Sequence, residues 1–309
     1  MSTTIPETMR AIMLSNLGPP SSLKIETIPT PNPPTWPKFA HSLLIARARL
    51  RHSPIRDVPL PRVLGIECVG TVAAVLEEEE DGGKGKDGLK GGMGRDFDGG
   101  YAEFCVVPRA QVARIGVEKG LEELGWDVWG ALPEMIQTST ILSSSAAELP
   151  QSVSPPQHWH PTSTTRQPSR TPLLLDTGAH HVLIDLPSGL PSPSTNIRFD
   201  TILELVGPTT LDDSFQLLRT GGVLCQAGIC GGKWILENWS PFAMEAEYFT
   251  SYASSVERFL ETSLDSVAGL VRGGKIRIPI RVFEGLGEIV EARRVMEVEG
   301  AAGNIVVVV

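Results

Sequence analysis

The stretch NIRFDTILELVGPTTLDDSFQLLRTGGVLCQAGICGG, from Asn196 to Gly232, decides the fold, because it predicts a strand, a helix and a second strand. Phe199 to Val206 is an apolar run broken by Asp200 and Glu204, as is typical of a buried parallel strand. Gly207-Pro208 follows directly and ends this strand.

The predicted helix begins after Thr210, a residue type favoured at the N-cap. The carboxylates of Asp212-Asp213 suit the positive end of the helix dipole in the first turn. Apolar residues recur at helical spacing at Leu211, Phe215 and Leu218. Thr220-Gly221-Gly222 stops the helix before the strand Val223 to Gly228. The stretch therefore predicts one unit of a doubly wound parallel sheet.

Two glycine-containing strand ends make this unit a candidate binding site. In doubly wound sheets, ligands bind outside the carboxyl ends of the strands, so a nucleotide would pass Val206-Gly207 and Ala227-Gly228. Glycine lets the backbone come close to a ligand there. The alternative, which the segment alone leaves equally open, is that these glycines only make tight turns.

Composition limits the classes of function. The chain has 309 residues, enough for two domains, and a formal net charge of -9 with a pI near 5.3. Without clustered Lys and Arg, a nucleic-acid surface is not expected. The sequence shows neither a signal peptide nor a run of about 20 apolar residues, so we expect no membrane association and a cytoplasmic location. Four cysteines, far apart in sequence or in strand-like settings, are expected to be reduced, buried thiols.

The sequence before the central unit shows clear secondary-structure patterns in some segments and none in others. Met9 to Leu14 and Leu23 to Ile28 predict a β-hairpin, whereas HSLLIARARLRHSPIR, residues 41–56, follows no clear pattern. Glu77 to Asp81 and the glycine-rich residues after it predict a surface loop, and its formal G-x-G-x-x-G follows five acids that would repel a pyrophosphate. Residues 139–172 contain no glycine and are rich in Ser, Thr and Pro, so we expect irregular chain there.

Much of the chain resembles the medium-chain dehydrogenase/reductase superfamily, in particular its zinc-independent quinone oxidoreductase and enoyl reductase branch. The segments that carry the resemblance appear in the family's order: MRAIML, LKIETIPTP, PRVLGIECVGTV, FDGGYAEFCVVP, ALPEMIQT, LLLDTGAHHVLID, FDTILELVGPTTLDDSFQLLRTGGVLCQAG, GGKIRIPIRVF, EIVEARRVME and GAAGNIVVVV. The resemblance implies an α/β protein with a GroES-like β-rich catalytic domain and a Rossmann-type doubly wound parallel sheet. We expect the catalytic domain at 1–130, the nucleotide-binding domain at 131–270 with 139–172 irregular, and a return to the catalytic domain at 271–309.

The resemblance also implies a function. It predicts an NADPH-dependent oxidoreductase that transfers a hydride to a quinone or to an activated carbon–carbon double bond of a small-molecule substrate. Thr138 would approach the nicotinamide, and Val206, Gly207, Ala227 and Gly228 would line the cofactor cleft. Family members often pair through the edge of the Rossmann sheet, and Val223 to Gly232 is the strand expected to do so in a homodimer.

Three departures from the family pattern matter. Ile66 precedes Glu67 where zinc-dependent relatives have a zinc-binding His, and no lobe of four closely spaced cysteines exists, so no metal site is expected. The G-L-N motif expected between Trp36 and Ser53 is absent. The glycine-rich cofactor turn, expected from about Thr138, is replaced by residues 139–172, so the Rossmann domain is expected to be incomplete.

These departures keep a second function open. A lost phosphate-binding turn removes charge-assisted bonds of roughly 1.5–3 kcal/mol each, enough to abolish cofactor binding. The chain would then be a catalytically impaired remnant, or a non-enzymatic binding protein that retains the shell of the fold; a cofactor-independent isomerase or cyclase using the old cleft is a third alternative. The two segments that do not match the family, residues 38–53 and 139–172, begin abruptly beside well-matched sequence. We interpret them as sequence translated out of frame or from a retained intron.

Overall fold

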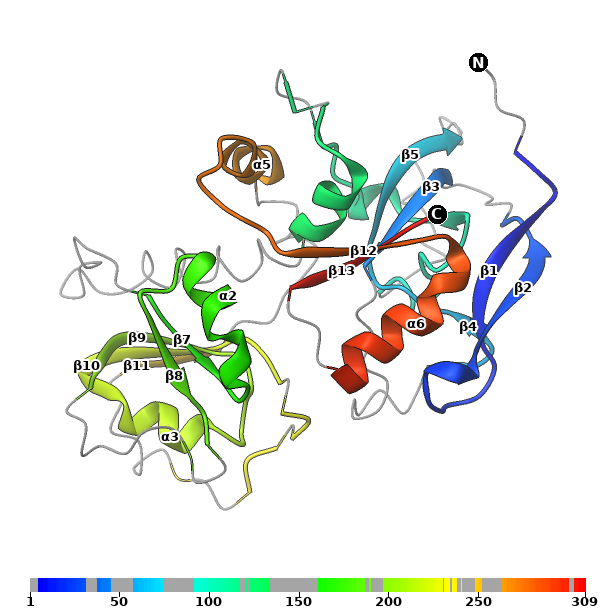
Figure 1. Ribbon diagram of the computed structural model, residues 1–309. Coiled ribbons are helices and arrows are strands. Elements are labelled where there is room, and N and C mark those ends of the chain that lie inside the picture. Colours follow the sequence, from blue (N-terminus) through cyan, green and yellow to red (C-terminus); the bar gives the residue numbers. More distant parts are fainter. Residues whose placement is uncertain are drawn as a thin grey trace, which may run out of the picture. The chain divides into compact units, whose positions relative to one another are not determined.

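The computed structural model describes residues 5–31, 38–45, 58–74, 92–116, 120–121, 123–133, 161–186, 189, 197–229, 231–233, 235–237, 240, 248–251, 263–299 and 303–309. The chain divides into two compact units. The first unit comprises Met1–Pro133 and Ser263–Val309, and the second comprises Glu134–Thr262. Figure 1 shows both units as ribbons coloured along the sequence.

The first unit contains two sheets. One has the order β2-β1-β4, with β1 (Thr8–Leu14), β2 (Leu23–Pro29) and β4 (Arg62–Val63) all antiparallel. The predicted hairpin is therefore confirmed, with Ile12 opposite Ile25. The second sheet has the order β12-β13-β3-β5, and β6 also pairs with β3. Its strands are β3 (Lys38–Ile45), β5 (Cys68–Ala74), β6 (Phe104–Val106), β12 (Ile280–Glu284) and β13 (Asn304–Val308).

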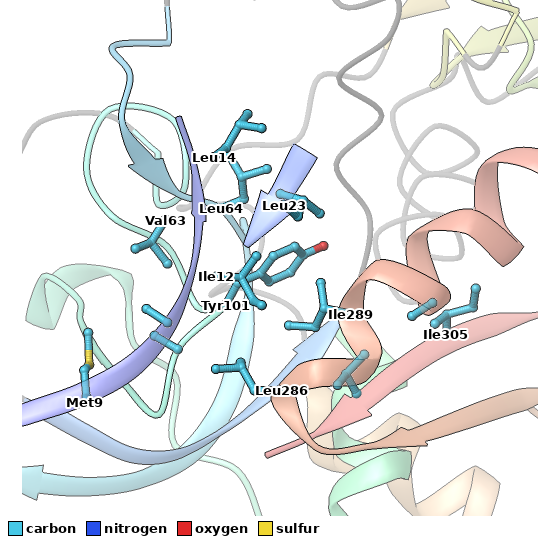
Figure 2. Packing of buried hydrophobic residues seen from close by; sticks show 14 of the residues in the cluster. Met9, Ile12, Leu14, Leu23, Val63, Leu64, Tyr101, Leu286, Ile289 and Ile305 are labelled. Carbon is cyan, nitrogen blue, oxygen red and sulfur yellow. The ribbon is translucent and has the colours of Figure 1, made fainter. Parts of the chain in front are cut away.

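Helices connect and cover these strands. Helix α6 (Ile289–Arg294) links the parallel strands β12 and β13 and continues into a π-helical turn at Val295–Glu299. The remaining helical segments of the unit are η1 (Pro20–Ser22), η2 (Arg109–Gln111), residues 126–133, α5 (Leu264–Arg272) and η6 (Leu286–Glu288). Figure 2 shows Leu286 and Ile289 packed toward Ile12 and Tyr101. All four residues belong to one hydrophobic core cluster of this unit.

The C-terminal residues complete the second sheet. Val306 to Val308 of β13 pair with β3 in antiparallel register, and all three central residues of β13 are buried. The apolar residues at the C-terminus thus form a buried strand. Lys38–Ile45, part of which followed no pattern in the sequence, thus lies between β13 and β5 and shares its backbone hydrogen bonds with three strands.

The strands described in the second unit pair in parallel. A three-stranded sheet has the order β11-β10-β9, formed by β9 (Phe199–Glu204), β10 (Leu218–Gln226) and β11 (Tyr248–Ser251). A separate pair joins β7 (Thr162–Thr165) to β8 (His181–Ile184), connected by η3 (Pro168–Arg170) and α2 (Thr171–Asp176). Helix α3 (Leu211–Gln216) crosses from β9 to β10 (Figure 1). The predicted strand–helix–strand unit with parallel strands, and with it the α/β class, is confirmed.

Three local expectations are wrong. Leu218 was expected in the helix, but α3 ends at Gln216 and β10 begins at Leu218, so Leu218 to Gly222 belong to a strand. The backbone pairing of Leu218 with Phe199 accounts for this, although Leu218 has the spacing of a helical residue. Residues 162–165 form a strand although 139–172 was expected to be irregular, because three β-branched threonines pair with β8. Val223 to Gln226 of β10 is paired on both sides, so this strand offers no edge to a second copy.

Other expectations concern residues outside the described ranges. They include the acidic and glycine-rich loop at 77–91, the arginine-rich residues 46–57 and residues 134–160. The missing cofactor turn therefore remains a prediction, as does a homodimer through another edge.

Candidate functional site

Glu204 ends strand β9 and organises the turn that follows it. Its carboxylate is buried, with 4% of the residue exposed. Oε1 accepts hydrogen bonds from the backbone N–H groups of Val206 (2.7 Å) and Gly207 (3.0 Å) and from the Thr210 hydroxyl (3.0 Å). Oε2 accepts a hydrogen bond from the Ser214 hydroxyl (2.5 Å). Four donors thus compensate the desolvation of this carboxylate and fix the backbone from β9 into α3.

Thr210 has a different role from the one expected. It occupies the N-cap position of α3, but its side chain makes no capping hydrogen bond. Its hydroxyl instead contacts Glu204 Oε1 and the Gly207 carbonyl oxygen (3.3 Å). The threonine therefore ties the helix start to the end of the strand before it.

The second glycine-containing strand end lies directly against this turn. The backbone N–H groups of Ala227 and Gly228 both donate to the carbonyl oxygen of Glu204, at 2.9 and 3.2 Å. A Cβ atom on Gly228 would lie 2.4 Å from the Leu205 carbonyl oxygen, closer than real Cβ atoms approach. Gly207 has φ of +94°, a conformation that favours glycine, and its α-carbon faces the Gly228 carbonyl.

The structure therefore brings together four of the five predicted site residues, Val206, Gly207, Ala227 and Gly228, at the carboxyl ends of neighbouring parallel strands. Thr138 lies outside the described residues. Sequence reasoning missed Glu204, which it treated only as a break in an apolar strand. An acid at the end of a buried strand, with Thr and Ser six and ten residues later, is the signal that could have identified it.

The hydrogen bonds decide which part of a dinucleotide this turn fits. Because Glu204 occupies the N–H groups of Val206 and Gly207 and carries negative charge, the turn does not fit a pyrophosphate. Glycine at 207 and 228 lets the two strand ends pack directly against each other, and Leu205 beside them is 40% exposed. The turn therefore suits an uncharged group better than a phosphate.

A second group of polar side chains is buried in the first unit. Arg293 on α6 forms an ion pair with Glu297 on the π-helical turn, with Nη2 2.5 Å from Oε1. The hydroxyl of Tyr101 lies near the Arg293 guanidinium without a hydrogen bond of good geometry, and Figure 2 shows it turned away from the β1 strand. Burial raises the pKa of Tyr101 above its usual range, and the charge of Arg293 offsets this only in part.

Neither a metal site nor a membrane span is found in the part of the chain that the structure describes. No three His, Cys, Asp or Glu residues among those ranges lie together as metal ligands would. None of the helices described combines the length and the hydropathy needed to cross a bilayer.

Comparisons with known proteins agree with this fold. Residues 177–307 match the family model described as zinc-binding dehydrogenase. No match was found among curated proteins. Three similar solved structures are an NAD-dependent alcohol dehydrogenase (18% identity, TM-score 0.71), a quinone oxidoreductase from Pseudomonas syringae pv. Tomato DC3000 (14%, 0.70) and a mycobacterial protein complexed with NADPH (19%, 0.71).

Each of these structures is aligned over its whole length, 100%, with 97% of this chain covered. At such low identity the likeness shows the fold, and it extends over both units. The match to the zinc-binding dehydrogenase model covers residues 177–307, and the whole chain shares its fold with an alcohol dehydrogenase and a quinone oxidoreductase.

Proposed function

We propose that this chain is an NADPH-dependent, zinc-independent oxidoreductase that transfers a hydride to a quinone or to an activated carbon–carbon double bond. The observation that carries the proposal is the junction of the two strand ends at the carboxyl edge of a parallel sheet, where Gly207 and Gly228 let the ends of β9 and β10 meet. Among proteins of the same fold, one is a quinone oxidoreductase and another was solved with NADPH, which supports the choice of substrate class and cofactor.

In this proposal the cofactor supplies the hydride, and the chain's own residues position it. Val206, Gly207, Ala227 and Gly228 line the cleft beside an uncharged part of the dinucleotide, with Leu205 as apolar surface. Glu204 holds the turn in shape and does not contact the substrate. Thr138 is proposed to approach the nicotinamide.

One observation favours a second candidate, a protein that keeps the fold but has lost cofactor binding. The N–H groups of Val206 and Gly207 are engaged by Glu204, so this turn supplies no donors to a phosphate. Phosphate donors must then come from other residues, and the sequence from 139 to 172 contains no glycine-rich turn to provide them.

A titration of the purified chain with NADPH distinguishes the two. We would follow nicotinamide fluorescence and the thermal midpoint, then measure NADPH oxidation with a small quinone and with an enone. A saturable rise of the midpoint together with oxidation of NADPH supports the oxidoreductase, because a ligand stabilises the state that it binds. A folded chain that shows no response at millimolar NADPH overturns it and supports the remnant.

A pair of variants tests the position of the site. Leu205→Asp places a negative charge beside the strand ends and should weaken NADPH binding at least about tenfold, which corresponds to roughly 1.4 kcal/mol. Leu175→Asp is the matched control, since Leu175 is similarly exposed (46%) but lies on α2. Equal affinities in both variants would place the cofactor away from this turn.

A further inference from the structure

Two cysteines of the first unit lie close together although 37 positions separate them. The Sγ atoms of Cys68 on β5 and Cys105 on β6 are 3.4 Å apart, and both thiols are free. The sequence predicted reduced, buried thiols, which agrees with these two free cysteines, but it did not predict that they lie side by side. Both cysteines lie on strands that pair with β3, Cys68 opposite Leu44 and Cys105 opposite Phe39.

The surroundings of the pair are apolar. Cys105 is 3% exposed and packs with Met93, Phe97 and Val107, whereas Cys68 at the margin of this cluster is only partly buried. Cys68 is therefore the more accessible residue of the pair. The apolar shell around Cys105 leaves Cys68 as its nearest reaction partner.

The geometry points to a reversible disulfide site: we propose that Cys68 and Cys105 form an intramolecular disulfide when the protein meets a peroxide. A disulfide has an S–S length of about 2.05 Å, so the sulfurs need to approach by roughly 1.4 Å.

The reaction balances in two steps. The Cys68 sulfur attacks one oxygen of hydrogen peroxide, the O–O bond breaks, and a sulfenic acid and one water form. The Cys105 sulfur then attacks the Cys68 sulfur, an S–S bond forms, and the second water leaves with the Cys105 proton. Two thiols lose two electrons in total, and one peroxide is reduced to two waters.

The reaction should be slow at neutral pH. The hydrogen bond with Cys105, together with burial, raises the pKa of the Cys68 thiol well above its usual value, although the residue keeps part of its surface exposed. The thiolate is the reactive form, so the oxidation rate should rise steadily as the pH is raised from 7 to 9.

Alkylation of the denatured chain after peroxide treatment tests the proposal. The reduced chain has four alkylatable cysteines, and oxidation should leave two, with one crosslinked peptide pair containing Cys68 and Cys105. A thiol reductant should restore all four. Cys225→Ser is the control, because this cysteine lies on β10 of the second unit and its loss should leave the crosslink intact.

The variants of the pair separate the two steps. In Cys105→Ser, the sulfenic acid on Cys68 has no thiol to attack it and should be captured by dimedone. In Cys68→Ser, neither the crosslink nor the adduct should form. The proposal is overturned if the oxidised wild-type chain keeps four alkylatable cysteines, or if Cys68 is joined to a cysteine other than Cys105.

Discussion

Ser214 on helix α3 donates a hydrogen bond to Glu204 Oε2 over 2.5 Å, across ten positions of sequence. The same carboxylate holds two backbone N–H groups and the Thr210 hydroxyl through its other oxygen. The buried carboxylate of Glu204, at the end of strand β9, therefore accepts hydrogen bonds from both the turn and helix α3. The backbone N–H groups of Val206 and Gly207 are therefore already engaged by the protein's own carboxylate.

Replacing this carboxylate should destabilise the second unit. In Glu204→Gln, the amide keeps one acceptor oxygen but turns an NH₂ group toward donors, so at least one buried donor loses its partner. We expect a loss of about 1–3 kcal/mol of unfolding free energy, measured by urea denaturation. Asp200→Asn is the control, since this carboxylate lies on the same strand but pairs with Arg219 at the surface, and the loss should stay below about 1 kcal/mol. Equal losses would show that the network around Glu204 adds no stability.

Gly228→Ala should also be destabilising. The new Cβ would lie 2.4 Å from the Leu205 carbonyl oxygen and 2.9 Å from its α-carbon, so the two strand ends must separate. A backbone shift of this kind costs roughly 1–3 kcal/mol. Gly269→Ala is the matched control, because this helical glycine of α5 has open space around it and alanine there should stabilise by about 0.5–1 kcal/mol. Urea unfolding of both variants checks the opposite signs; an unchanged Gly228→Ala protein would contradict the close approach.

Local sequence signals located part of this fold. An apolar run ended by Gly-Pro predicted β9, and two short strand-like segments, Met9 to Leu14 and Leu23 to Ile28, predicted the hairpin of β1 and β2, because each signal lies within one segment. The boundary between α3 and β10 was missed, since it depends on the pairing of Leu218 with Phe199. Thr162–Thr165 was missed for a related reason: its composition is that of irregular chain, and only its partner β8 makes it a strand.

The polar sites were harder to predict than the strands. Gly207 and Gly228 were identified because glycine at a strand end has a conformational meaning. The Cys68–Cys105 pair and the burial of Arg293 depend on residues far away in sequence, and no local pattern carries that information. In such cases the topology decides which side chains meet.

Tyr101→Phe should change the alkaline stability of the first unit and little else. Burial raises the pKa of Tyr101, so the folded chain retains this proton to a higher pH than the unfolded chain does. The resulting stability is fully present below the unfolded value of about 10 and is lost as the pH rises through the folded value. The variant should lack this loss, and below pH 10 it should match the wild type within about 1 kcal/mol, because the hydroxyl has no well-formed hydrogen bond.

Titration of tyrosinate absorbance checks this assignment directly. The chain has three tyrosines, and the one that ionises last should be missing from the Tyr101→Phe spectrum. Urea unfolding at a series of pH values gives the accompanying stability. If the variant instead lacks a tyrosine that ionises in the usual range, Tyr101 is not the buried group described here.

Breaking the Arg293–Glu297 pair should cost more than any of these changes. The two side chains are 3% and 8% exposed, and Nε, Nη1 and Oε2 have no further hydrogen-bond partner in the structure. Arg293→Met leaves the Glu297 carboxylate buried without its counter-ion, which typically costs about 3–5 kcal/mol. The double variant Arg293→Met with Glu297→Leu removes both charges and should recover most of this loss.

Arg294→Met is the control on the same helix, because its pair with Glu291 is 44% exposed on each side and is expected to contribute at most about 1 kcal/mol. Urea unfolding of the four proteins completes the comparison. If the double variant is as unstable as Arg293→Met, the loss comes from packing of the arginine side chain, and the charge of Glu297 is not its cause.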